Sequence, residues 1–352
     1  MNWNQVGKAG VAIMAVAVCV SAHAESKGVV ASVVAEKASL GKNDNVAVNL
    51  TITNTSSQPQ MMLKWHTAFA EIEESLFVVT RDGLKVPYLG AHYKRGAPSA
   101  SDYYLLKPGA SHTVRVDLAD MYDMSITGQY TIAYKAASVN LFGTHEKTVG
   151  EITSPVASVW IDGAQPRGAQ SIAGKAPADT GNSLAALSFS KCTAAQQGEI
   201  TQAIGVASGY ANNATSYMGG ALGARYSKWF GASDAGRIAH VKANYTAIKG
   251  AFDSKPITVD CGCKKTYYAY VYPNQPYKIY VCKAFWTAPM SGTDSKGGTL
   301  VHEMSHFTAT AGTDDWVYGQ SGAASLAISD PAKATDNADS HEYFGENTPA
   351  QN

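Results

Sequence analysis

Hydrophobic and polar residues alternate along most of the first half of the chain, with the two-residue period of a half-buried β-strand. The alternation is regular within residues 46–52, 114–118, 130–134 and 156–161, and turn-forming Asn, Asp, Gly and Ser residues separate these runs. Short strands at this spacing are typical of a β-sandwich. The pattern therefore predicts an all-β, immunoglobulin-like sandwich over residues 25–161.

The pattern changes in the second half. Residues 162–190 are rich in Gly, Ala, Pro, Ser and Asp without a clear period, so we expect an exposed linker there. Further on, a tyrosine-rich stretch over residues 267–282 predicts a β-hairpin, and the rest has helical spacing. Helices are expected at 193–210, 234–253, 296–310, 320–329 and 331–346. The chain is therefore predicted to be multidomain, with a mainly α, zincin-type (α+β) domain over residues 191–352.

The N-terminus has the features of an export signal. Lys8 precedes an apolar run from Gly10 to Val20, and Ala-His-Ala follows at residues 22–24. This arrangement predicts a secretory signal peptide over residues 1–24. The apolar run is too short for a permanent membrane anchor. We expect a secreted, extracellular monomer without a membrane anchor.

Composition narrows the functional classes. The 352 residues are enough for two hydrophobic cores, and 45% of them are hydrophobic. The 28 Lys and Arg residues balance the 28 Asp and Glu residues, and only 16% of the chain is charged. A balanced charge of this kind gives no basic surface, so no nucleic-acid partner is expected.

Four cysteines follow the expected signal peptide: Cys192, Cys261, Cys263 and Cys282. An even number of cysteines in an exported protein predicts disulfide bonds. Cys261 and Cys263 are too close in sequence to be expected to pair with each other. We expect the bonds Cys192–Cys261 and Cys263–Cys282, the second of which would close the predicted hairpin.

The most informative motif is His-Glu-Met-Ser-His at residues 302–306. On a helix, residues four apart lie on one face, so His302 and His306 can bind one metal ion. Glu303 then lies where it can hold a water molecule beside that ion. The histidines of the first half have no such spacing: His66, His92, His112 and His145.

Two histidines leave a catalytic zinc site incomplete, because such sites usually have three protein ligands. Glutamate from a later helix is one source of the third ligand, with Glu342 and Glu346 as candidates. Aspartate is another, and Asp315 follows His306 by nine residues. Its short side chain requires a sharp turn of the backbone, which Gly312 permits.

Residues 312–319 read Gly-Thr-Asp-Asp-Trp-Val-Tyr-Gly. This segment after the His-Glu-x-x-His motif resembles the aspzincin, or deuterolysin-type, zinc metalloendopeptidases. The sequences Tyr-Gly-Gln at 318–320 and His-Glu-Tyr-Phe at 341–344 resemble most closely the peptidyl-Lys branch of that family. The resemblance covers about 160 residues after Cys192. The first half resembles the prosegment of the family's bacterial zymogens, an inhibitory and chaperone-like domain.

The resemblance implies one Zn²⁺ ion per catalytic domain, held by His302, His306 and Asp315. Asp314 adjoins Asp315 and could compete for the metal, although the motif's spacing favours Asp315.

The resemblance also implies the chemistry. Glu303 is expected to act as the general base that activates a water molecule, and Tyr318 to stabilise the oxyanion. Asp339 and Glu342 match the acids that line the lysine pocket of the peptidyl-Lys branch. Protein and peptide substrates would then be cut on the N-terminal side of Lys, and such a secreted enzyme could serve as a virulence factor or toxin.

This specificity suggests how the protein could mature. Lys175 lies in the predicted linker, so cleavage of the Gly174–Lys175 bond would release the catalytic domain. Until then, the prodomain is expected to act as an intramolecular inhibitor. Lys94 is the candidate that would occupy the lysine pocket, and Lys85 is its rival.

Two other functions remain open. One is a thermolysin-like gluzincin with Glu342 as the third zinc ligand. The other is a non-enzymatic extracellular binding protein in which the zinc is structural. Proteolysis that is sensitive to chelators would separate an enzyme from a binding protein.

Overall fold

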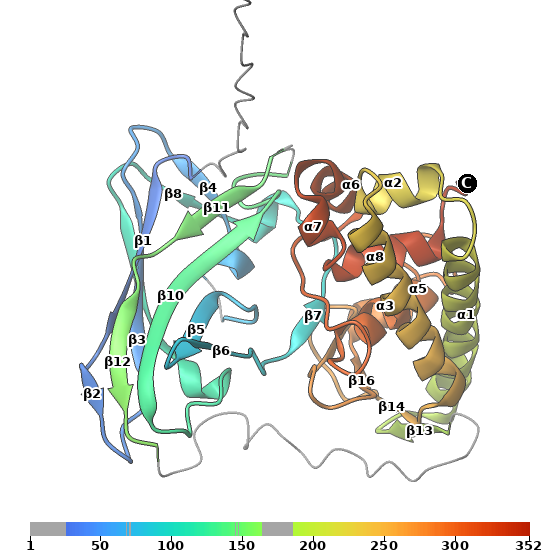
Figure 1. Cartoon of the computed structure of the whole chain (residues 1–352), viewed down its shortest axis with the longest axis horizontal. Coiled ribbons are helices and arrows are strands. Elements are labelled where there is room, and N and C mark those ends of the chain that lie inside the picture. The colour runs from blue at the N-terminus through green and yellow to red at the C-terminus, as the bar shows by residue number, and fades with distance from the viewer. Residues whose placement is uncertain (1–25, 68, 70–71, 145, 147, 164–185) are drawn as a thin grey trace, which may run out of the picture.

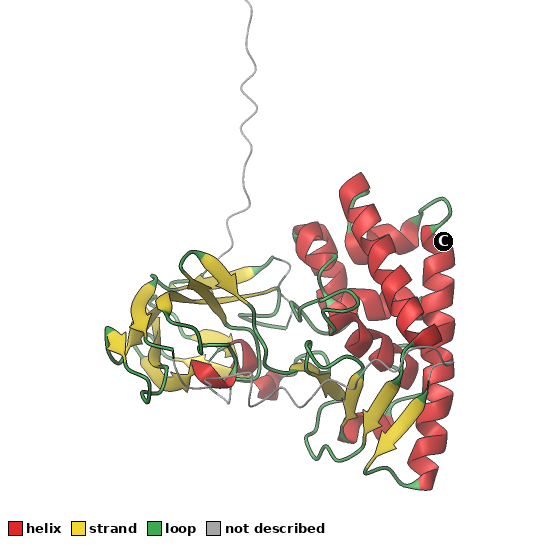
Figure 2. Cartoon of the chain, turned by 60° about the horizontal axis from the view of Figure 1, so that its bottom comes forward, coloured by secondary structure: helices red, strands yellow, loops and turns green. Residues whose placement is uncertain are grey.

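The computed structural model describes residues 26–67, 69, 72–144, 146, 148–163 and 186–352. The expected signal peptide and the Gly174–Lys175 bond lie outside these described residues. Most strands gather on one side of the molecule, and the helices lie on the other side together with a smaller sheet (Figures 1 and 2). The fold is therefore α+β, with the strand-rich half first in the sequence.

The first half is built almost entirely of strands. One antiparallel sheet has the order β1-β3-β9, and a second sheet has the order β2-β12-β10-β5-β6 with β11 also paired to β10. β4 and β8 form a separate pair. The strands of this half are β1 (Val29–Ala35), β2 (Ser39–Leu40), β3 (Ala47–Asn54), β4 (Gln60–Leu63), β5 (Phe77–Arg81), β6 (Leu84–Val86), β7 (His92–Lys94), β8 (Tyr103–Leu106), β9 (Ser111–Asp117), β10 (Gly128–Ser138), β11 (Gly150–Thr153) and β12 (Ala157–Ile161).

Alternate residues of these strands form the core of the first half. Leu50 and Ile52 of β3 and Tyr130 and Ile132 of β10 are fully buried in one hydrophobic cluster. Their spacing is the two-residue period of the sequence, so the predicted β-structure is observed. The finer assignment of an immunoglobulin-like sandwich stays a prediction.

One strand of the first half belongs to the other half. β7 pairs antiparallel with β15, and it forms the edge of a sheet with the order β13-β14-β16-β15-β7. The strip carrying β7 runs between the two halves in Figure 1. A boundary near residue 161 thus separates two cores but not two independent sheets. This pairing could not be predicted, because three residues are too few to reveal a period.

The second half packs helices against that sheet. Its strands are β13 (Leu187–Ser190), β14 (Ile257–Asp260), β15 (Ala269–Val271) and β16 (Lys278–Val281). Its helices are α1 (Ala194–Met218), α2 (Ala224–Phe230), α3 (Ala235–Ser254), α4 (Lys283–Thr287), α5 (Lys296–His306), α6 (Gln320–Ser329), α7 (Pro331–Ala334) and α8 (Ala338–Glu346). Every residue of α5 is buried, so this helix is the centre of the domain.

Three predictions about elements need correction. The linker expected to extend to residue 190 ends earlier, because β13 pairs in parallel with β14. The helix expected over 296–310 ends at His306, where the chain turns. The helix expected over 331–346 is two helices, α7 and α8, separated at residues 335–337. The break allows the backbone oxygen of Asp336 to accept a hydrogen bond from the backbone N–H of Asp314.

The two disulfide bonds are those expected from the sequence. Cys192–Cys261 joins the segments that follow β13 and β14, and Cys263–Cys282 joins the start of the hairpin region to the end of β16. Both bonds therefore fasten the sheet to which β7 adds an edge strand.

The last residue of α8 fixes the start of α5. Glu346 accepts hydrogen bonds from the backbone N–H of Ser295 at 2.9 Å, from its hydroxyl at 2.8 Å and from the backbone N–H of Asp294 at 3.2 Å. Gly298 makes this approach possible, since a Cβ atom there would lie 2.0 Å from the Glu346 carboxylate. The two helices that carry the candidate site are thus held in register.

Candidate metal and substrate site

The His-Glu-x-x-His motif lies on the last turns of α5. His302, Glu303 and His306 are all fully buried, and the Nε2 atoms of the two histidines are 3.1 Å apart. The helical spacing therefore brings both imidazoles to one point, as the motif predicts. Nδ1 of His306 lies 2.7 Å from the backbone oxygen of Thr313. A hydrogen bond donated by Nδ1 to this oxygen leaves the lone pair of Nε2 free to bind a metal ion.

A tight turn brings Asp315 to the same point. Gly312 has φ +62°, a conformation that suits glycine, and it follows the end of α5 closely. Asn337 holds the other side of the turn, because its side-chain oxygen accepts hydrogen bonds from the backbone N–H groups of Trp316 and Val317 at 2.9 and 3.1 Å. Oδ1 of Asp315 lies 3.3 Å from Nε2 of His302, and Oδ2 lies 3.4 Å from Nε2 of His306.

These three side chains fit a zinc ion. Ligand atoms about 2.0 Å from a tetrahedral ion lie about 3.3 Å from one another. The observed separations of 3.1, 3.3 and 3.4 Å match that spacing. Both carboxylate oxygens of Asp315 are buried and make no hydrogen bond to any described residue. A buried carboxylate without hydrogen bonds is costly unless it binds a cation.

The ionisation of His306 and Asp315 suits metal binding. Burial lowers the pKa of His306 to about 3, although the charge of Asp315 acts in the opposite direction, so the imidazole is neutral. Burial would raise the pKa of Asp315, but the nearby His306 and His302 outweigh it and hold this pKa below its usual value. Neutral imidazole and ionised carboxylate are the forms that bind metals.

Glu303 follows His302 on α5. Both of its oxygens are buried and make no hydrogen bond within the described part of the chain. Burial raises the pKa of this carboxyl well above its usual value. A carboxyl with a raised pKa is suited to take and return a proton near neutral pH.

Tyr318 lies against the first half of the molecule. Its hydroxyl is 2.8 Å from the backbone oxygen of Tyr93 and 3.0 Å from Oε1 of Glu74. Arg95 contacts the same Glu74 carboxylate at 3.2 Å. The residue expected to face an oxyanion is therefore in contact with a strand of the first half, and it donates its hydrogen bond there.

The acidic pair predicted on the last helix lies next to the ammonium group of Lys94. Nζ of Lys94 lies 2.8 Å from Asp339, 2.8 Å from Glu342 and 3.7 Å from Asp294. Lys94, Asp339 and Glu342 are fully buried. Burial would lower the pKa of Lys94, but the three carboxylates outweigh it and raise this pKa well above its ordinary value. The ammonium group therefore keeps its positive charge, and the neighbouring carboxylates balance that charge.

Other predicted candidates lie elsewhere. Asp314 is partly exposed and approaches His92 rather than the histidines of α5. Glu346 holds the start of α5, as described above, and Lys85 lines a cavity beside Asp314 and Asp336. Glu342 faces Nδ1 of His302 at 3.4 Å, on the opposite side of the ring from Asp315.

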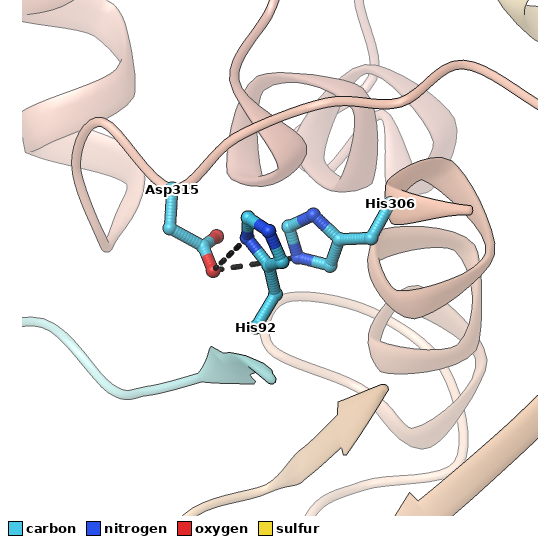
Figure 3. Close-up of side chains that lie close together, drawn as sticks. All are labelled: His92, His306 and Asp315. Carbon is cyan, nitrogen blue, oxygen red and sulfur yellow. Dashed lines mark ion pairs between the residues drawn. The ribbon is translucent and has the colours of Figure 1, made fainter. Parts of the chain in front are cut away.

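Sequence reasoning missed two residues of this region. Asp294, just before α5, is the third carboxylate near Lys94, and no motif marks it. His92 was set aside because it lacks ligand spacing, yet its Nδ1 lies 3.9 Å from Oδ2 of Asp315. Figure 3 shows the Asp315 carboxylate facing the rings of both His92 and His306. The available signal was the position of His92 two residues before Lys94, which places both on one face of a strand.

Several known proteins are similar to this chain. The family described as lysine-specific metallo-endopeptidase matches residues 218–346. An extracellular protease of Aeromonas hydrophila is 49% identical over 317 residues, which cover 89% of this chain and 91% of that protein. A peptidyl-Lys metalloendopeptidase of Grifola frondosa is 35% identical over 97% of this chain and 98% of its own length. The solved structure of a zinc peptidase from Grifola frondosa is 45% identical and covers 46% of this chain and all of its own, with a TM-score of 0.45.

The matching family and these relatives identify a zinc metalloendopeptidase. This chain belongs to the aspzincin family, which confirms the resemblance carried by its two motifs. Among the described residues, no helix is both long and apolar enough to cross a membrane.

Proposed function

We propose that this protein is a secreted zinc endopeptidase that is made as a latent precursor and cuts peptide bonds on the N-terminal side of lysine. The observation that carries the proposal is the position of Lys94. Its ammonium group lies between Asp339 and Glu342, and Asp339 in turn lies 2.9 Å from His302. A site for a lysine side chain therefore adjoins the metal-binding residues.

In this proposal His302, His306 and Asp315 hold the zinc ion. The gluzincin alternative requires Glu342 on the same side of His302 as the metal. Because Glu342 faces Nδ1 while Asp315 and His306 face Nε2, the geometry favours Asp315. A bound zinc ion supplies Lewis acidity, which lowers the pKa of a water molecule and polarises the scissile carbonyl.

Two residues carry the proton and charge movements. Glu303 accepts a proton from the attacking water and passes it to the departing amine. Tyr318 donates a hydrogen bond to the carbonyl oxygen as negative charge develops on it. The contact between the Tyr318 hydroxyl and the backbone oxygen of Tyr93 supports this role, because a peptide carbonyl already receives that hydrogen bond.

The lysine preference follows from charge. Asp339 and Glu342 are buried carboxylates, and leaving them without a cation is costly. A substrate lysine would replace Lys94 once the first half leaves. An arginine side chain is longer and carries a planar head, so it would not reproduce the contact of a compact ammonium with both carboxylates.

The first half would keep the enzyme latent by filling this site. Residues 25–161 would act as the inhibitory prodomain, and cleavage near Gly174–Lys175 would free the catalytic domain. The name of the Aeromonas hydrophila relative, extracellular protease, supports export, for which residues 1–24 would serve as the signal.

The proposal is tested by digesting denatured proteins with the precursor and with its processed form. Mass spectrometry of the products should show lysine as the first residue of most new N-termini. A chelator should abolish cleavage, and zinc should restore it. The uncleaved precursor should be at least tenfold less active than the processed form. Cleavage that resists chelation, or new N-termini without a preference for lysine, would contradict the proposal.

A further inference from the structure

The strand that delivers Lys94 also delivers a second side chain to the site. Alternate residues of a β-strand point to one side, so His92 and Lys94 share a face of β7 while Tyr93 points away. On the other face of β7, the ring of Tyr93 contacts the rings of Tyr267 and Tyr270, and each pair of ring centroids is 5.3 Å apart. The pairing of His92 with Val271 and of Lys94 with Ala269 sets the register of the strand.

His92 meets the metal-binding residues at this register. Its Nδ1 lies 3.9 Å from Oδ2 of Asp315, and its ring stacks on that of His306 with centroids 4.6 Å apart. One ligand atom from each of His92, His306 and Asp315 lies within 4.8 Å of the other two. The imidazole of His92 is buried, so in this position it is shielded from solvent.

We propose that His92 is the fourth ligand of the zinc ion in the latent precursor. This inference rests on the proposed function, because it requires that His302, His306 and Asp315 hold the metal. A catalytic zinc site keeps one position open for water, whereas a four-ligand site is closed and structural. The prodomain thus supplies the ligand that converts the first kind of site into the second.

The observed spacing requires only a small adjustment. The distance of 3.9 Å to Asp315 exceeds the separation of about 3.3 Å between tetrahedral ligands by about half an ångström. The competing partner of His92 is Asp314, whose Oδ1 lies 3.6 Å from the same Nδ1. This distance is too long for a hydrogen bond, and Asp314 is partly exposed, so the imidazole is not committed to it.

A fourth ligand explains why the enzyme does not cut β7 while this strand occupies the site. Lys94 occupies the lysine pocket, and the carbonyl oxygen of Tyr93 lies 2.8 Å from the Tyr318 hydroxyl. The Tyr93–Lys94 bond is therefore presented much as a substrate would be. A zinc ion would need an open position to activate water for hydrolysis, and the imidazole of His92 would occupy that position. Loss of the prodomain would remove the ligand and the false substrate together.

The ligand count is measured by X-ray absorption on the full-length precursor with one equivalent of zinc, in a Glu303→Gln background that keeps the chain intact. We expect three imidazoles in this protein and two in His92→Ala. His92→Phe keeps a ring against His306 without a ligand atom, so it gives the same test if the alanine variant does not fold. His112→Ala is the matched control, because its ring stacks near Phe69 and Tyr104 instead. Removal of zinc by a chelator should be at least tenfold faster in the His92 variants.

The outcomes separate the two proposals. Three imidazoles that fall to two, with the control unchanged, support ligation by His92. Two imidazoles in the parent, or an unchanged number in both His92 variants, overturn this inference while the zinc site of the proposed function stands. A parent that binds no zinc, or binds it equally well after Asp315→Ala, overturns the proposed function itself.

Discussion

Nδ1 of His302 lies 2.9 Å from Oδ1 of Asp339, the same oxygen atom that lies 2.8 Å from the ammonium group of Lys94. The second oxygen of Asp339 accepts a hydrogen bond from the backbone N–H of Gly319 at 2.6 Å. One carboxylate thus joins the lysine pocket to a proposed zinc ligand. A carboxylate on the outer nitrogen of a ligand histidine orients the ring and raises its basicity.

Asp339→Asn should therefore impair two functions at once. We expect zinc affinity to fall about 10- to 100-fold, because the ligand histidine loses its carboxylate partner. The preference for lysine should fall in the same variant, since the pocket loses one of its negative charges. Competition with a chromophoric chelator measures the first effect, and mass spectrometry of digestion products measures the second.

Glu342→Gln is the matched comparison. Glu342 lies as close to Lys94 as Asp339 does, but it is 3.4 Å from Nδ1 of His302 rather than 2.9 Å. We expect a loss of lysine preference with a smaller change in zinc affinity. Equal losses of zinc affinity in the two variants would mean that Asp339 has no special role in orienting His302.

Lys94→Met should weaken the hold of the first half on the site. Removing the cation leaves the buried carboxylates of Asp339 and Glu342 without the ammonium charge between them, and breaking a buried ion pair costs about 3–5 kcal/mol. In a precursor that also carries Lys175→Ala, to block the proposed cleavage, we expect peptidase activity to rise at least tenfold. Lys85→Met is the control, because Lys85 is outside the lysine pocket. Equal activity in both variants would argue against inhibition through Lys94.

Much of the geometry of the candidate metal site could be predicted because it is local in sequence. The helical spacing of His302 and His306 and the turn at Gly312 bring together residues only nine positions apart, from His306 to Asp315. The helical periodicity was likewise readable from short-range pattern, and the even number of cysteines predicted two disulfide bonds.

The contacts between the two halves could be predicted only in part. Lys94 was a candidate because the resemblance implied a lysine pocket, although it is 245 residues from Asp339. Nothing in the sequence marked β7 as an edge strand of the other half, and Asp294 has no motif. His92 looked ordinary because its partners, His306 and Asp315, come from distant parts of the chain. Tertiary contact, not local pattern, gives these residues their environment.

Glu303→Gln should separate folding from catalysis. The amide has nearly the same shape as the carboxyl and cannot act as a base. We expect unchanged zinc content and thermal stability, with kcat reduced about 10²- to 10⁴-fold, the usual contribution of a general base. Metal analysis, thermal unfolding and peptide hydrolysis measure the three quantities. Glu36→Gln, an exposed position paired with Arg115, should leave all three unchanged. Substantial activity of Glu303→Gln would assign the base elsewhere.

Asn337→Ala tests whether the turn positions the third ligand. The side chain of Asn337 is fully buried, and its loss leaves two backbone N–H groups without their acceptor. We expect a loss of about 2–4 kcal/mol in the free energy of unfolding and weaker zinc binding through Asp315. Asn212→Ala, on the exposed side of α1, is the control. Normal zinc affinity in a destabilised Asn337→Ala protein would show that the turn holds Asp315 by other contacts.

Glu346 should make the stability of the protein depend on pH. Burial, and then the charge of Glu342, raise the pKa of Glu346 from 4.5 to about 9, against the effect of the hydrogen bonds from Ser295. The folded protein therefore holds a proton that the unfolded chain has released. The stability that this proton provides is complete below about pH 4.5 and is lost as the pH rises towards 9.

Glu346→Gln keeps the side chain uncharged at every pH. Between pH 5 and pH 9, its free energy of unfolding should fall less than that of the parent, as measured by denaturant titration. The same dependence on pH in both proteins would mean that the Glu346 carboxylate is ionised in the folded state, held by the hydrogen bonds from Ser295 and Asp294 at the start of α5.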